Sequence, residues 1–118
     1  MICFLLEGLS GTVLAENGCL LEVTDWKPRT EIVSFRPTIY VTFRSQCGAE
    51  IDVNSAKIWI NDAPIDPTVS GSGSQVMVSF TPDYDMKEEA DHNVKMQIKD
   101  INGVVGEKTW FFWIPMVY

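Results

Sequence analysis

The sequence is short of histidine, of basic residues and of long apolar runs, and each shortage excludes a class of function. Its 9 Lys and Arg residues stand against 16 Asp and Glu, which leaves a formal net charge of −7. A nucleic acid or an anionic lipid surface requires clustered basic side chains, so we predict neither as a partner. No apolar run reaches the roughly 18 to 20 residues that cross a bilayer, so we predict no membrane insertion.

The single histidine, His92, limits the available chemistry. A blue-copper site takes two histidines and a cysteine, which this chain cannot supply. Nucleophilic catalysis needs a base beside the nucleophile, and His92 begins an expected strand, where we predict a structural hydrogen bond to the backbone. Acidic residues gather at 83–91, and Asp100 and Asn102 flank a turn, but the spacing is not that of an EF-hand, which favours a solvated loop over a calcium site. We predict a non-enzymatic protein with no cofactor.

Three cysteines, at positions 3, 19 and 47, leave two alternatives open. Their long spacings fit no C-x-x-C zinc pattern. The thiols are either unpaired, or one disulfide ties Cys47 to Cys3 or to Cys19.

The first residues, 1–18, form an apolar segment of their own. They look superficially like a secretory signal, with Val13 and Ala15 suited to cleavage. However, no Lys or Arg precedes the apolar stretch and Glu7 interrupts it. We interpret the segment as an N-terminal arm or extra strand that precedes a single domain at 19–118.

The remainder is typical of short strands separated by turns. Apolar and polar residues alternate with period 2, as in half-buried strands, at 37–43, 55–60, 75–80 and 92–100. Further strands are expected at 19–26 and 107–114. Turn residues lie at 70–73 and 102–103, and 83–91 is the one stretch that suits a helical turn. About seven strands in one domain predict an antiparallel β-sandwich.

The motifs RPTIYVTF, IDVNSAKIWIND, VMVSFTPDYDM, HNVKMQIKDINGV and KTWFFWI, in this order, resemble the bacterial immunoglobulin-like repeats of surface and secreted proteins. The resemblance covers roughly residues 22–114. It implies an immunoglobulin-like sandwich, a structural or adhesive role, a strand-end turn at Thr81-Pro82, and a core that includes Ile39, Ile58, Val94, Trp110 and Phe112.

The chain departs from that family pattern in several places. Ala63 replaces the usual turn glycine, Met86 replaces a leucine, and the KEEAD stretch appears one residue longer than the family's. In the last strand, aromatic residues 111 and 113 occupy positions that are polar in the family. The cysteines also lie outside the family pattern.

The last strand carries apolar residues on both faces. Phe111 and Trp113 are expected on the outer face of a sheet formed by 55–60, 92–100 and 107–114, and Trp59 is expected beside them. Phe111 and Trp113 alone would form a patch of roughly 300–500 Å². Three alternatives remain for what covers this patch: the chain's own N-terminal arm, another subunit or neighbouring module, or a sugar.

We therefore predict an all-β, immunoglobulin-like module of an extracellular or cell-surface assembly, such as a filament or a multi-repeat subunit. It would act through protein–protein contacts, either with a protein partner or by self-assembly. The predicted interface residues are Trp59, Phe111, Trp113, Phe4, Leu6 and Leu9. The alternative is a carbohydrate-binding module that stacks a glycan on the same exposed aromatic residues.

Overall fold

The computed structural model describes residues 20–29 and 34–115, which form eight strands in two antiparallel four-stranded sheets. One sheet contains, in spatial order, β1 (Leu21–Lys27), β2 (Ile39–Ser45), β6 (Gln75–Phe80) and β5 (Thr68–Ser72). The other contains β4 (Ala63–Ile65), β3 (Ile51–Ile60), β7 (Ala90–Asp100) and β8 (Val105–Ile114).

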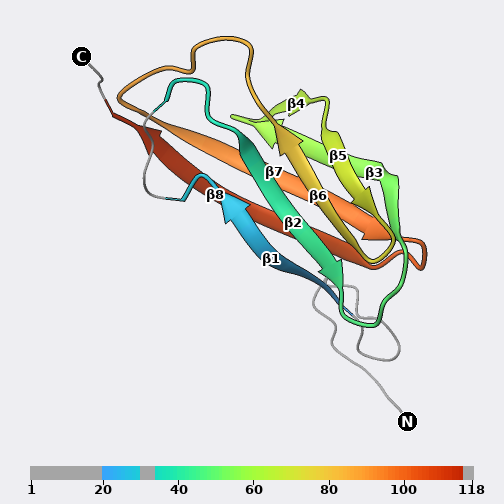
Figure 1. Ribbon diagram of the computed structural model, residues 1–118. Helices are drawn as coiled ribbons and strands as arrows, with labels where there is room; N and C mark the ends of the chain where they lie inside the picture. The colour runs from blue at the N-terminus through green and yellow to red at the C-terminus, as the bar shows by residue number, and fades with distance from the viewer. Residues whose placement is uncertain (1–19, 30–33, 116–118) are drawn as a thin grey trace.

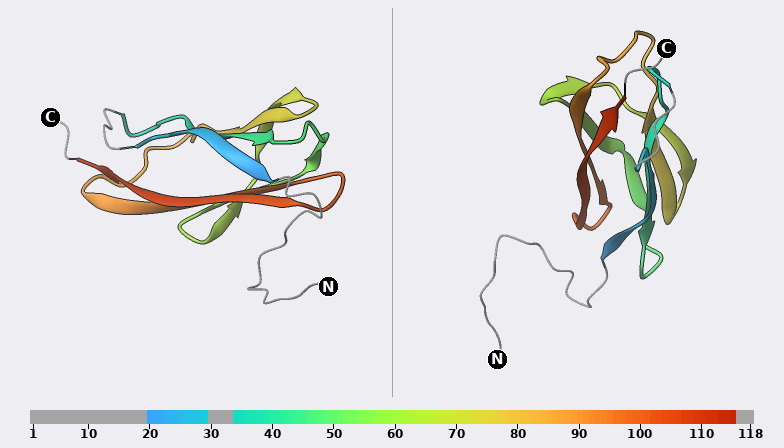
Figure 2. Two further views of the ribbon diagram at one scale, coloured as in Figure 1. Left: turned by 90° about the horizontal axis from the view of Figure 1, so that it is seen from below. Right: turned by 90° about the vertical axis from the view of Figure 1, so that its left-hand side faces the viewer.

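The two sheets pack face to face as a sandwich (Figure 1). The left view of Figure 2 shows the layers from the side, with β7 and β8 in one layer and β1 and β2 in the other. The strand order is that of immunoglobulin domains, in which strands A, B, E and D form one sheet and C, F and G form the other, here with an added strand beside C. The predicted fold class, an immunoglobulin-like β-sandwich, is confirmed.

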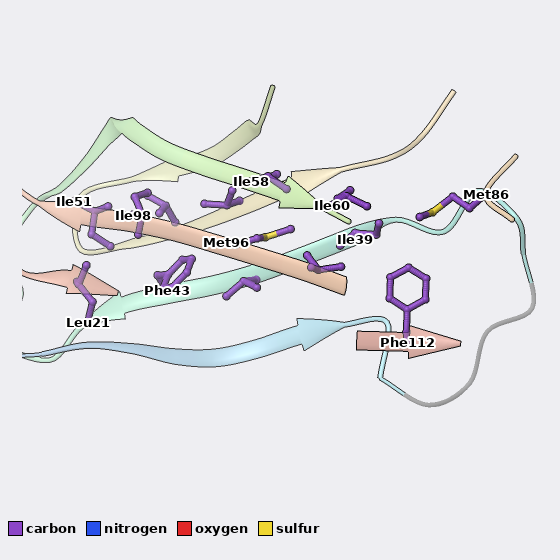
Figure 3. Close-up of a cluster of buried hydrophobic side chains, with 14 of the residues drawn as sticks. Leu21, Ile39, Phe43, Ile51, Ile58, Ile60, Met86, Met96, Ile98 and Phe112 are labelled. Carbon is purple, nitrogen blue, oxygen red and sulfur yellow. The ribbon is translucent and has the colours of Figure 1, made fainter. Parts of the chain in front are cut away.

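The core is built from the period-2 stripes of the strands. In β2, Ile39, Val41 and Phe43 are all buried. Figure 3 shows side chains of β2, β3 and β7 pointing into the space between the sheets. Each such side chain contributes roughly 1.5–3 kcal/mol relative to an exposed position, so these stripes dominate the stability of the sandwich.

The core positions implied by the family resemblance are buried at four of the five residues. These are Ile39, Ile58, Val94 and Phe112. The fifth, Trp110, is half-buried and packs at the margin of the core. Its ring N–H donates a hydrogen bond to the Pro28 carbonyl oxygen at 2.9 Å, which links β8 to the segment after β1.

Several local predictions are wrong or incomplete. Residues 70–72, expected in a loop, belong to β5, and the turn lies at positions 73 and 74, where Gly73 has a φ of +78°. The stretch 83–91 forms no helical turn: it contains bends and the start of β7. The described residues contain no helix, and therefore none there is long and apolar enough to cross a membrane. The predicted arm at 1–18 lies outside the described residues, so its boundary stays a prediction.

Strand β3 begins at Ile51, four residues earlier than expected, and a bulge interrupts its pairing with β7. The register shifts between Asp52 and Lys57. The Ser55 hydroxyl bridges the irregularity: it accepts from the Lys99 backbone N–H at 2.9 Å and donates to the Asp52 carbonyl at 2.6 Å. Because a side chain replaces the missing backbone partner, the strand can continue through the bulge.

An aromatic–cation stack holds β1 against β8. The Trp26 ring lies between two cations, with the Arg29 guanidinium 3.9 Å and the Lys108 ammonium 3.8 Å from its centroid. Asp25 fixes one side of this stack, since it accepts from Arg29 at 3.1 Å and from the Tyr40 hydroxyl at 2.9 Å. The hydrogen bond from Tyr40 is the main cause that lowers the pKa of Asp25, and the same bond raises the pKa of Tyr40.

Replacing Tyr40 with Phe is expected to raise the pKa of Asp25 toward its ordinary value of 3.8, because the largest lowering interaction is removed. The hydrogen bond from Tyr40 to the Asp25 carboxylate stabilises the fold at pH values above 3.8. This stabilisation is lost as the pH falls through the lowered pKa of Asp25. A carbon-detected NMR titration of the Asp25 carboxyl measures the change. Tyr84→Phe, at an exposed tyrosine, is the control and leaves Asp25 unchanged. Equal Asp25 titrations in the wild type and in Tyr40→Phe would contradict the assignment.

The two sheets approach each other closely at Gly106. A Cβ atom at this position would lie 2.8 Å from the Leu21 Cβ and 3.1 Å from the Phe43 ring. We expect Gly106→Ala to lower the free energy of unfolding by about 1–3 kcal/mol, the usual cost of overpacking. Thr109→Ala, at an exposed position of the same strand, should change it by no more than about 0.5 kcal/mol in the same denaturant titration. If both variants unfold at the same denaturant concentration, the sheets are not in tight contact there.

Candidate functional site

The outer face of the sheet formed by β4, β3, β7 and β8 carries the aromatic residues singled out in the sequence. In β8, Phe112 and Ile114 point into the core, so Phe111 and Trp113 point outward. Phe111 is 62% exposed and Trp113 is 49% exposed. We call these two residues the aromatic edge, because β8 is the last strand of its sheet in the described residues.

Trp59 lies on the same face but does not adjoin the aromatic edge. It is on β3, and β7 separates β3 from β8. In the register, Trp59 lies opposite Lys95, and Lys95 lies opposite Thr109 of β8. Neighbouring strands are about 4.8 Å apart, so roughly 10 Å separates β3 from β8. The expected single patch is therefore two separate features on one face.

A groove of about 400 Å³ lies over β7 between these features. Its lining residues are Trp59, Asp62, Asn93, Val94, Lys95 and Thr109. The Lys95 ammonium lies 5.1 Å from the Trp59 ring centroid and 3.9 Å from the Glu107 carboxylate. A flat ring, an amide and a lysine at one groove can contact apolar and polar groups of a ligand, but they include no nucleophile with an adjacent base.

A second groove of about 260 Å³ follows on the same face at the bulge of β3. It is lined by Ser55, Lys57, Gln97, Ile98, Lys99 and Val105. Sequence reasoning identified the polar alternation of 93, 95, 97 and 99 along β7 but assigned these residues no role. The alternation along β7 indicates that these four side chains face outward. The sequence does not indicate that Lys57 lies opposite Gln97, because this pairing depends on the bulge in β3.

His92 has the structural role predicted from its position at a strand. Its ring Nε2 lies 2.8 Å from the Lys87 carbonyl oxygen, and its Nδ1 lies 3.1 Å from the Asn61 side-chain nitrogen. Asn61 Oδ1 accepts from the Asn93 N–H at 2.9 Å, which directs the Asn61 amide N–H toward His92. Nδ1 is therefore the acceptor and Nε2–H the donor. Both ring nitrogens are engaged, so His92 does not serve as a base.

The Asn61 amide reaches His92 because of the turn that joins β3 to β4. Asn61 and Asp62 have φ values of +52° and +69°. Positive φ at both central residues is the pattern of a type I′ turn, in which Gly, Asn and Asp are the preferred residues. Ala63, where the resembled family has glycine, follows this turn as the first residue of β4.

One acidic residue of the β6–β7 connection forms an ion pair, and Asp100, at the end of β7, forms turn contacts. Asp85 accepts from Arg36 at 2.8 Å. Asp100 is buried and accepts from the Asn102 and Val104 backbone N–H groups at 2.8 and 2.9 Å, which closes the β7–β8 turn. Among the described residues, no three His, Cys, Asp or Glu side chains gather where they could hold a metal ion.

Cys47 is disulfide-bonded, which decides one of the alternatives that the sequence left open. It lies in the connection between β2 and β3. The remaining predicted interface residues, Phe4, Leu6 and Leu9, lie outside the described residues, so their contact with the aromatic edge stays a prediction.

No protein-family model matches the chain, and no curated protein matches it. The fold is similar to the crystal structure of CopC from Methylosinus trichosporium OB3b, with a TM-score of 0.49 and 17% sequence identity. The match covers 83% of this chain and 99% of that one.

These comparisons do not support the predicted structural or adhesive module: no family model and no curated relative matches, and the structural similarity concerns the fold alone. We therefore withdraw the adhesive, filament-forming module, together with its carbohydrate-binding alternative. Membership of the bacterial immunoglobulin-like repeats is not shown, since no family model matches.

The hydrogen bonds of His92 predict its tautomer. We expect the neutral ring to carry its proton on Nε2, because Nδ1 accepts from Asn61. As the chain has one histidine, a long-range ¹H–¹⁵N spectrum at pH 8 reports this ring alone. Asn61→Ala removes the donor and should cost about 1–3 kcal/mol of stability, since buried polar groups lose their partners. A proton on Nδ1 in the wild type would overturn the assigned network.

Proposed function

We propose that this chain is a non-catalytic domain that acts outside the cytoplasm and holds an extended segment of a partner protein on the outer face of β3, β7 and β8. The observation that carries the proposal is the aromatic edge, where the large aromatic side chains of Phe111 and Trp113 are 62% and 49% exposed. Aromatic side chains at a protein surface are the residues that most often anchor a protein partner.

The size of the aromatic edge indicates how much of the binding it can supply. Phe111 and Trp113 together expose roughly 250 Å². At about 25 cal/mol per Å², full burial gives at most roughly 6 kcal/mol. Association alone costs about 4–15 kcal/mol in lost freedom of movement. The aromatic edge therefore anchors a ligand only together with other contacts, and the neighbouring grooves are where those contacts lie.

The net charge and the disulfide support a protein partner in an oxidising compartment. A charge of −7 opposes the binding of a nucleic acid or an anionic membrane. The disulfide at Cys47 supports a location outside the cytoplasm, where such bonds persist. The resemblance to bacterial immunoglobulin-like repeats is kept as a proposal about family alone.

We propose no metal site for this chain. Both ring nitrogens of His92 have partners, and the described residues show no cluster of metal-ligating side chains. A surface for a polypeptide is the function that the arrangement of side chains supports best.

The test is a selection of a displayed library of linear peptides against the folded protein. The variant with Phe111→Ser and Trp113→Thr serves for comparison. We expect the selected peptides to bind the wild type and to lose at least tenfold in affinity with this variant. Because both positions are exposed, circular dichroism and unfolding should remain close to those of the wild type.

The matched control changes two exposed apolar residues elsewhere, Tyr84→Ser and Ile101→Thr, which are 46% and 64% exposed. It should bind the selected peptides with wild-type affinity. Peptides that bind all three proteins equally, or a selection that enriches no peptide, would contradict the proposal.

A further inference from the structure

A basic site lies on the outer face at a distance from the aromatic edge. Lys57 of β3 lies opposite Gln97 of β7, and Lys99 is the next residue of β7 that points the same way. Both lysines line the second groove, beside Ser55 and the apolar Val105. We call Lys57 and Lys99 the lysine pair.

The lysine pair has no ion-pair partner among the described residues. This contrasts with Lys95 on the same face, which pairs with Glu107 and lies over the Trp59 ring. In a chain that carries 16 acidic residues and 9 basic ones, Lys57 and Lys99 place two lysines side by side, with Asp52 opposite Lys99 but not in an ion pair with it. Like charges on neighbouring strands repel each other, and an anionic group placed between them relieves this repulsion.

We propose that the lysine pair binds a carboxylate side chain of the same polypeptide segment that the aromatic edge anchors, so the ligand is an extended, acidic peptide with an aromatic or large apolar residue. This inference rests on the proposed function and names the chemistry of its ligand. A peptide fits this face because the lysine pair complements a carboxylate at one end of it and the aromatic edge exposes apolar surface at the other.

The register sets the spacing of the two groups in the ligand. Phe111 and Lys57 are separated by four residues along the strands, from 111 to 107, and by two strand spacings, from β8 to β3. With about 3.4 Å per residue and about 4.8 Å per strand, the separation of the backbones is roughly 17 Å. An extended chain covers this distance in about five residues. The carboxylate is thus expected about five positions from the aromatic residue.

A polyanion does not fit the same face. Asp52 lies opposite Lys99, Glu107 lies beside Gln97, and Asp91 lies opposite Trp113. These carboxylates surround the lysine pair and the aromatic edge, so a ligand with a negative charge at every position would meet repulsion along its length. One or two carboxylates at a fixed distance from an apolar residue match the pattern of charge.

The experiment uses the peptides selected on the whole chain and the variant Lys57→Gln plus Lys99→Gln. The matched control is Lys27→Gln plus Lys87→Gln, which removes the same charge at two exposed lysines away from this face. We expect selected peptides to carry Asp or Glu about five positions from an aromatic residue. The lysine-pair variant should bind them at least tenfold more weakly, the control variant within twofold, and added salt should weaken only the binding of the wild type and the control.

An exchange of charges between protein and peptide tests the same contact if the glutamine variant loses binding for another reason, such as a change in its fold. Lys57→Glu plus Lys99→Glu should recover binding when the peptide acid is changed to lysine. Peptides that depend on the aromatic edge, lack acids and bind the lysine-pair variant normally would overturn this inference and leave the proposed function standing. A selection with no peptide that depends on the aromatic edge would overturn both.

Discussion

A β-strand directs successive side chains to opposite faces, and in β8 this alternation separates the stability of the sandwich from its surface. The strand has apolar residues at almost every position of its second half. Phe112 and Ile114 are taken by the core, which leaves Phe111 and Trp113 outside by geometry alone. Removing the outer pair therefore costs little in folding, whereas removing the inner pair would open the space between the sheets. A surface whose residues contribute little to folding can be specialised for binding.

Much of the fold follows from the sequence because its strands obey a simple period. The stripes at Ile39, Val41 and Phe43 and at Val94, Met96 and Ile98 mark buried faces, and the fold class follows from the number and spacing of such strands. What the period does not provide is register. The bulge between Asp52 and Lys57 depends on a hydroxyl of Ser55 that bonds to a residue 44 positions away, and no local pattern indicates it.

The sequence predicted the candidate site only in part, because alternation gives the face on which a residue lies but not its neighbours on the next strands. Alternation placed Phe111, Trp113 and Trp59 on one face, and the order of strands in the sandwich determined that β7 lies between them. The functional role drawn from family resemblance was wrong, which illustrates that a fold carries many functions and that the site must be argued from its own side chains. His92 shows the opposite case: its position at a strand start predicted a structural role, and its ring contacts with Asn61 and with the Lys87 carbonyl agree with that role.

The stack of Lys108 on Trp26 has a consequence for how any partner can approach. Lys108 belongs to the inward-facing set of β8, where it lies opposite Met96, yet it carries a charge. A foreign strand added along β8 would extend the sheet past this lysine and trap its ammonium between two layers. Natural sheets discourage runaway edge-to-edge association with such inward charges. The domain can thus expose a long terminal strand without acting as a template for aggregation, and recognition is directed to the broad face of the sheet.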